Sequence, residues 1–154
     1  MKKIVFMGTP LFAVPILKSI LSKGYNIPLV YTQPPSKSNR GHKVSKSPVH
    51  IFCNENDLKV RTPENFINLD NEKNILEKLE ADIAIVVAYG QILPKGILHV
   101  CKKGFINIHA SLLPKLRGAA PIQRSIMNLD NETGISIMQI NDKLDQGKVY
   151  SQYK

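Results

Sequence analysis

A stretch spanning residues 104–126 constrains the fold more than any other part of the chain. It begins at residues 105–108, three of which are apolar, and this pattern predicts a short buried strand. Residues 110–118 should form a turn, because Pro114 cannot continue a strand ladder. A helix is predicted over residues 119–129. Polar side chains at the end of a strand that leads into a loop and a helix are typical of ligand sites in open α/β sheets.

Two polar side chains on the predicted strand stand out. Asn107 and His109 are two residues apart, so both should project from the same face of the strand. An amide and an imidazole on one face can donate hydrogen bonds to a single oxygen, which suits stabilisation of an oxyanion in acyl transfer. The pair by itself also fits a plainer interpretation, in which Asn107 caps a turn and His109 is a satisfied core histidine.

The rest of the chain alternates between strand and helix patterns. The most apolar run, residues 82–90, should be the central strand. Pro15 indicates that the first helix begins late. The chain should close with a hairpin whose loop, residues 141–147, carries Asp142 and Asp145; aspartates in turns are usually turn formers. We therefore predict one domain with a doubly wound, mostly parallel open α/β sheet, Rossmann-like, ending in a β-hairpin. Further strands are expected at 3–7, 27–32, 58–61, 133–140 and 148–153, and helices at 16–23, 47–56, 71–81 and 97–103.

The charge balance favours an anionic partner. Lys and Arg number 21 against 12 Asp and Glu, which gives a net charge of +9. Residues 33–46 contain no acidic residue and should form a mobile surface loop. Its basic side chains could contact phosphates, or the segment could be a solvated linker. These side chains are Lys37, Arg40, Lys43 and Lys46.

Other site classes find little support. Cys53 and Cys101 are far apart and form no Cys-x-x-Cys, which argues against a disulfide framework and fits a reducing cytoplasm. The 4 histidines show no metal-ligand spacing, so no metal is expected. The apolar N-terminal run ends at Gly8, which is too short for a signal or a membrane span. Residues 91–96 could line an apolar pocket for a flat heterocycle or form an ordinary loop.

A longer motif carries a family resemblance. Residues 107–114, Asn-Ile-His-Ala-Ser-Leu-Leu-Pro, resemble the signature of folate-dependent formyltransferases. Residues 117–124, Arg-Gly-Ala-Ala-Pro-Ile-Gln-Arg, resemble the branch that acts on methionyl-tRNA, and Arg40-Gly41 matches a dipeptide in that branch's inserted basic loop. The resemblance extends from the first strand to the last residue. Within it, the hairpin sequence Leu-Asp-Gln-Gly is similar to the loop that supplies the family's catalytic aspartate, at Asp145.

The resemblance implies transfer of a formyl group from 10-formyltetrahydrofolate to the amino group of initiator methionyl-tRNA. Asn107 and His109 would donate to the oxyanion, and Asp145 would favour the imidazolium of His109 and help remove the amine's proton. The basic loop would contact the tRNA. Ser111 fits a turn or a folate contact better than a nucleophile. The residues expected to bind the donor are Ser111, Leu112, Leu113, Pro114, Gln91, Ile92 and Leu93.

Two alternatives stay open at the level of sequence. The acceptor could be a small amine such as glycinamide ribonucleotide or an amino sugar nucleotide, or the chain could be a non-catalytic RNA-binding module. The resemblance also implies a further helix and strand and a second, β-barrel tRNA-binding domain. We therefore expect residues 1–154 to be a catalytic domain that is incomplete at its C-terminus, with uncertain activity of its own. We expect a cytoplasmic monomer that does not bind membranes.

Overall fold

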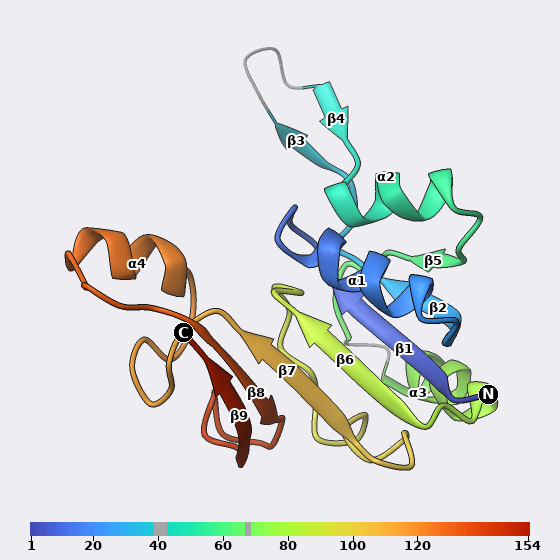
Figure 1. Cartoon of the computed structure of the whole chain (residues 1–154). Helices are drawn as coiled ribbons and strands as arrows, with labels where there is room; N and C mark the ends of the chain where they lie inside the picture. The colour runs from blue at the N-terminus through green and yellow to red at the C-terminus, as the bar shows by residue number, and fades with distance from the viewer. Residues whose placement is uncertain (39–42, 67–68) are drawn as a thin grey trace.

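A computed structural model describes residues 1–38, 43–66 and 69–154 (Figure 1). One sheet has seven strands in the order β5-β2-β1-β6-β7-β8-β9, and a separate two-stranded ribbon pairs β3 with β4. The strands are β1 Lys3–Gly8, β2 Asn26–Tyr31, β3 Ser36–Ser38, β4 Lys43–Ser45, β5 Val60–Arg61, β6 Ile83–Val87, β7 Phe105–His109, β8 Ile135–Gln139 and β9 Val149–Tyr153. The helices are α1 Ala13–Ser22, α2 Pro48–Glu55, α3 Leu69–Leu79 and α4 Pro121–Met127.

The sheet is parallel over its first five strands and antiparallel over its last two. β2 pairs with β5 and β1, β1 with β6, and β6 with β7, all in parallel. β8 then runs antiparallel to β7, and β9 antiparallel to β8. The predicted mostly parallel open sheet ending in a hairpin is confirmed, and β6 is the central strand as its apolar run indicated.

Helices and turns cover the two faces of the sheet. On β1, Val5 and Met7 point to one face and Phe6 to the other, as the two-residue period of a strand requires. The face with Phe6 packs against α1 and α2, whereas the face with Val5 packs against α3 and the segment of residues 97–101. Because β1, β6 and β7 are parallel neighbours, their carboxyl ends lie together at one edge of the sheet. α4 and the β3–β4 ribbon lie on this side of the sheet (Figure 1).

The first helix begins earlier than predicted. α1 starts at Ala13, two residues before Pro15. A proline is tolerated there because the amides of the first helical turn have no partner within the helix. Thr9 does not cap this helix: its hydroxyl donates to the carbonyl of Tyr89 over 2.8 Å. α2 lies within the helix predicted over residues 47–56, and its cap is Ser47, whose hydroxyl accepts from the amide of His50.

The prediction of a helix over residues 97–103 is wrong, because this segment is a run of turns. Its amides bond three residues back, as from Ile97 to Pro94, or leave the segment altogether. Lys102 and Lys103 donate their amides to the carbonyls of Ala81 and Asp82, just before β6. These bonds to the neighbouring strand satisfy the backbone without a helix.

Part of the basic segment, which was predicted to be a mobile surface loop, forms strands. Residues 36–38 and 43–45 form the antiparallel ribbon, with Lys37 opposite Val44 in register. Backbone pairing satisfies the polar groups of a segment that has little apolar area to bury. In Figure 1 the ribbon projects away from the sheet above α2.

Candidate functional site

The site starts on β7, where Asn107 and His109 project to the same face as predicted. Across the antiparallel pairing, Asn107 lies opposite Met138 and His109 opposite Ser136. His109 is buried, with 6% of its surface exposed. Apolar neighbours on both sides hold the strand in place, because Phe105 packs into one core face and Ile108 against the other.

The β8–β9 hairpin brings Asp145 to this pair from 38 residues away in the chain. One carboxylate oxygen, Oδ1, accepts a hydrogen bond from the Asn107 amide over 3.4 Å. The other, Oδ2, accepts from the backbone amide of Gly118 over 2.7 Å and lies 3.7 Å from Nδ1 of His109. Asp145 has a left-handed backbone, with φ of 48°, which turns the loop back toward β7. The three residues predicted to be catalytic are thus in one cluster.

Both ring nitrogens of His109 face oxygen atoms. Nδ1 faces the Asp145 carboxylate, and Nε2 lies 2.9 Å from the carbonyl oxygen of Leu116. A carbonyl can only accept, so Nε2 carries the hydrogen of that bond. The ring is therefore fixed between the hairpin and the turn that follows β7, and it does not point into the apolar core.

A second set of polar contacts holds that turn, and the sequence did not single it out. The buried hydroxyl of Ser136 donates to the carbonyl of Ser111 over 2.6 Å and accepts from the amide of Leu113 over 3.0 Å. Gln152, on β9, donates to the Leu113 carbonyl and to the Ser136 hydroxyl. The sequence held one signal for these contacts, which is a serine, Ser136, at a buried position of the mostly apolar strand β8.

The residues predicted to bind the donor fall into two turns. Ser111 is fully buried and its hydroxyl donates to the Lys115 carbonyl over 2.6 Å, so that side chain stabilises its own turn. Of its neighbours in the turn, Leu112 is half-buried, Leu113 is buried and Pro114 is exposed.

In the other turn, Ile92 is exposed and Leu93 packs partly against the core. The Gln91 side-chain nitrogen donates to the Pro63 carbonyl over 2.8 Å. Its amide oxygen is buried and has no hydrogen-bond partner among the described residues. That oxygen could accept from a bound ligand or a water.

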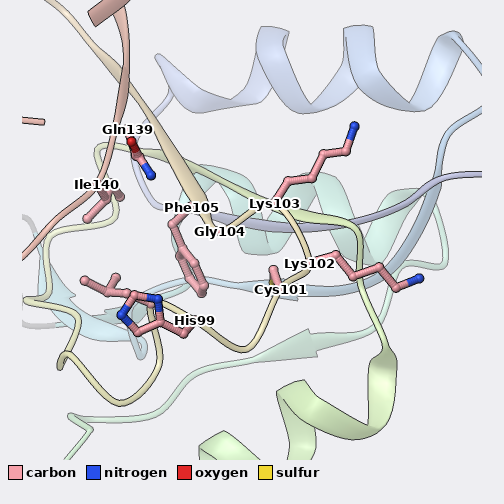
Figure 2. A pocket seen from close by; sticks show the side chains of 9 residues that line it. His99, Cys101, Lys102, Lys103, Gly104, Phe105, Gln139 and Ile140 are labelled. Carbon is pink, nitrogen blue, oxygen red and sulfur yellow. The ribbon is translucent and has the colours of Figure 1, made fainter. Parts of the chain in front are cut away.

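Two adjoining hollows lie on the same face of β7 as Asn107, toward the start of the strand. One has a volume of about 370 Å³ and the other about 350 Å³, and they share Leu98, His99, Gln139 and Ile140. Figure 2 shows His99, Phe105 and Ile140 gathered around the first of them. None of the seven residues predicted to bind the donor lines either of these two hollows.

An ion pair joins the two segments that border the second hollow. Lys95 Nζ lies 2.8 Å from the Asp142 carboxylate, between the turn after β6 and the hairpin loop. The hydrogen bond from Lys95 lowers the pKa of Asp142 below its ordinary value, and the bond to Asp142 raises the pKa of Lys95. Both side chains are largely in water, so the pair contributes little stability.

Three of the four basic residues assigned to tRNA fall in described segments. Lys46 is exposed, just before α2. Lys37 and Lys43 belong to β3 and β4, and Arg40 lies outside the residues that the structure describes. Across the described residues, no group of three or more His, Cys, Asp or Glu side chains could hold a metal ion. No helix in the described part of the chain is long and apolar enough to cross a bilayer.

Comparison with known proteins identifies relatives along the whole chain. The formyl transferase family matches residues 1–154. The chain is 62% identical over 153 residues to a methionyl-tRNA formyltransferase of Pelagibacter ubique, covering 99% of this chain and 49% of that protein. It is 50% identical over 149 residues to one of Paramagnetospirillum magneticum, covering 97% of this chain and 48% of the relative. The chain thus spans about half the length of these curated relatives.

A solved structure has the same fold at low sequence identity. Phosphoribosylglycinamide formyltransferase from Bacillus halodurans superposes with a TM-score of 0.78 at 17% identity, covering 99% of this chain and 78% of that one. Sequences this different share the architecture, so the likeness supports the fold alone.

Proposed function

The chain belongs to the formyl transferase family, and from this premise we propose that its Asn107–His109–Asp145 cluster transfers a formyl group from 10-formyltetrahydrofolate to the amino group of methionyl initiator tRNA. The observation that carries the proposal is the position of Asp145, whose carboxylate bonds Asn107 and faces His109. An aspartate that only shaped a turn would not need to reach two polar side chains of a strand 36 residues or more away in the chain.

The donor supplies an electrophilic formyl carbon whose oxygen becomes anionic when an amine adds to it. Asn107 has a second amide hydrogen besides the one directed at Asp145, and it would donate that hydrogen to the oxyanion. His109 would donate from Nε2, exchanging the Leu116 carbonyl for the oxyanion. Asp145 would hold the imidazole and take up the amine's proton, directly or through one water.

The chemistry balances without a covalent intermediate on the protein. The new bond joins the amine nitrogen to the formyl carbon, and the bond from that carbon to the folate nitrogen breaks. The proton lost by the amine passes through the Asp145–His109 pair and ends on the departing folate nitrogen. No nucleophilic side chain is required, which agrees with a Ser111 hydroxyl engaged by the Lys115 carbonyl.

We assign the donor to the two turns that the resemblance indicated, residues 91–93 and 111–114. The unpaired, buried oxygen of Gln91 offers an acceptor for an N–H group of a pteridine ring. Ile92 and Leu93 add apolar surface, and the turn with Leu113 and Pro114 is fixed by Ser136. These groups would contact a flat heterocycle beside the site.

The acceptor assignment rests on the basic ribbon. Lys37, Arg40, Lys43 and Lys46 fall within ten residues that contain no acid. The described strands of this segment, β3 and β4, extend from the side of the sheet where the parallel strands end (Figure 1). A small amine such as glycinamide ribonucleotide would not need this projection. The high identity to methionyl-tRNA formyltransferases supports the same choice.

The test is a transfer assay with radiolabelled formyl donor and two acceptors, charged initiator tRNA and glycinamide ribonucleotide. Calorimetry with tetrahydrofolate reports donor binding separately. We expect donor binding, transfer to the tRNA, and loss of transfer but not of donor binding in His109→Ala. Absence of tetrahydrofolate binding by the folded chain would refute the donor assignment, and transfer only to the small amine would refute the acceptor.

A further inference from the structure

Three exposed cations follow the site residues of β7. Lys115 and Arg117 lie in the turn after His109, and Arg124 lies on α4. We call Lys115, Arg117 and Arg124 the turn–helix patch. It is separate in sequence and in space from the basic ribbon, because α4 and the ribbon project from different parts of the sheet's carboxyl edge (Figure 1).

No ion pair among the described residues neutralises the charge of this patch. Residues 83–129 contain six Lys and Arg residues and no Asp or Glu. Lys95 and Lys102 form ion pairs with Asp142 and Asp82, but none of the three patch residues has an ion-pair partner in the described part of the chain.

Two of the nearby carboxylates are already engaged, and a third, Asp130, follows α4 without an ion pair among the described residues. Asp145, in the hairpin loop, bonds Asn107 and the amide of Gly118, and Glu132, before β8, pairs with Lys154 over 2.8 Å. Three uncompensated cations in about ten residues raise the local positive potential and attract an anion to this surface.

The patch is directly attached to the site. Arg117 lies between Leu116, whose carbonyl meets Nε2 of His109, and Gly118, whose amide bonds Asp145. The backbone of Arg117 is thus flanked by the two groups that contact His109 and Asp145, so its exposed side chain starts beside the site. An acceptor that carries a phosphate near its amino group would bring that phosphate close to Arg117.

We propose that the turn–helix patch binds phosphates of the single-stranded 3′ end of an RNA acceptor, as a second anchor besides the ribbon. The inference rests on the proposed function and adds a surface to it. With one anchor on the ribbon and one beyond His109, the strand that carries the amine lies across the carboxyl edge of the sheet. Each anchor alone fixes a position, whereas two fix the direction of the strand.

Exposed apolar side chains on α4, including Ile126 and Met127, would also suit an anionic membrane surface. We favour RNA because a bilayer lying against Arg117 would cover the approach to His109 and Asp145. Aliphatic side chains beside the cations also give unstacked bases an apolar surface to contact. Membrane binding is accordingly an outcome that the test must separate.

The experiment measures binding of the folded chain to a labelled RNA hairpin that ends in a few unpaired nucleotides, by anisotropy over a range of salt concentrations. The test variants are Lys115→Gln/Arg124→Gln and, separately, Arg117→Gln. The matched control is Lys18→Gln/Lys23→Gln, which removes two exposed charges on and after α1, away from the site. Arg124→Lys keeps the positive charge at this position and should bind RNA like the wild type.

For a single-stranded contact, each lost cation should reduce the slope of log K against log salt by roughly 0.7. The salt slope of the double variant should therefore be shallower by about 1.4. If both proteins bind equally at 1 M salt, the double variant should bind about 25-fold more weakly than the wild type at 0.1 M salt. The control should keep the wild-type slope. A double variant that binds like the control overturns the proposal, as does a wild-type chain that binds no RNA.

Two further measurements separate the possible failures. Binding to phosphatidylserine vesicles that falls in the patch variants, while RNA binding does not, would assign the patch to membranes and overturn the RNA proposal. Tetrahydrofolate binding should be unchanged in all variants. If the chain neither binds tetrahydrofolate nor transfers formyl, the proposed function fails, whereas a patch-dependent loss of RNA affinity would still establish the patch.

Discussion

Gln33 and Gly90 are 57 residues apart in sequence, and the side-chain amide of Gln33 donates a 2.9 Å hydrogen bond to the carbonyl oxygen of Gly90. The backbone amide of Gln33 also donates to the Thr9 hydroxyl, which in turn donates to the Tyr89 carbonyl. Gln33 precedes the basic ribbon, and Gly90 begins the turn with Gln91. The base of the ribbon is thereby fixed against the turn that we assign to the donor.

Gln33→Ala should destabilise the chain and misplace the ribbon. Loss of one partly exposed hydrogen bond should cost about 1 kcal/mol, which lowers Tm by about 2–4 °C in a domain of this size. RNA affinity should fall as well, because the ribbon loses its anchor. Asn56→Ala, which removes an exposed bond to the Phe52 carbonyl, is the matched control and should leave RNA affinity unchanged.

A double-mutant cycle sharpens this test. A Cβ on Gly90 would collide with the Gln33 side chain, and Gly90 has φ of 86°, where an alanine is strained by about 1–2 kcal/mol. Gly90→Ala should therefore cost more in the wild type than in Gln33→Ala, as measured by urea unfolding. Equal costs in both backgrounds would mean that the two residues are not coupled.

Asp145→Asn should reduce formyl transfer by about 10²–10⁴-fold, the usual contribution of a general acid or base. The asparagine keeps the shape of the side chain and can still accept from the Gly118 amide, so Tm should change little. Asp142→Asn, three residues earlier, removes a carboxylate that only pairs with Lys95 and should retain transfer. Full activity of Asp145→Asn in single-turnover assays would exclude a role for its charge.

Gly147→Ala should disrupt the hairpin that positions Asp145. The added Cβ would collide with the backbone carbonyl of Gln139, and backbone atoms cannot move aside as a flexible side chain can. We expect a loss of about 1–3 kcal/mol in unfolding free energy and loss of transfer.

Gly24→Ala is the control, because nothing lies within 4 Å of its Cβ and only its φ of 76° is strained. It should lose some stability yet keep transfer per folded molecule. If both variants lose transfer in proportion to their stability, the hairpin has no particular role in activity.

The Lys95–Asp142 pair predicts a pH effect at the edge of the site. Because the folded-state pKa of Asp142 is lowered, the pair makes a small stabilising contribution to the hairpin at neutral pH, and that contribution is lost as the pH falls through the lowered pKa. In Lys95→Gln the carboxyl pKa should rise toward its ordinary value, as measured by NMR titration of the side chain. An unchanged titration would show that the ion pair does not form in solution.

Local sequence determined much of this protein. The two-residue period of a strand places Asn107 and His109 on one face, whatever else the chain does. The unbroken apolar run of β6 requires a position covered on both faces, and Ser47 with Pro48 starts α2 through capping and a preset φ. Each of these effects acts within a few residues, so the printed sequence was enough to predict them.

Tertiary structure decided the rest. Residues 97–103 form turns because their amides find acceptors just before β6, a strand whose position no periodicity in that segment encodes. The resemblance indicated Asp145, but only the folded hairpin shows its carboxylate between Asn107, Gly118 and His109.

Two further contacts could not be predicted: the hydrogen bond between Nε2 of His109 and the Leu116 carbonyl, and the one from the Ser136 hydroxyl to the Ser111 carbonyl. Such contacts join segments far apart in the chain, and they form only where the packing of the whole sheet leaves a donor and an acceptor facing one another.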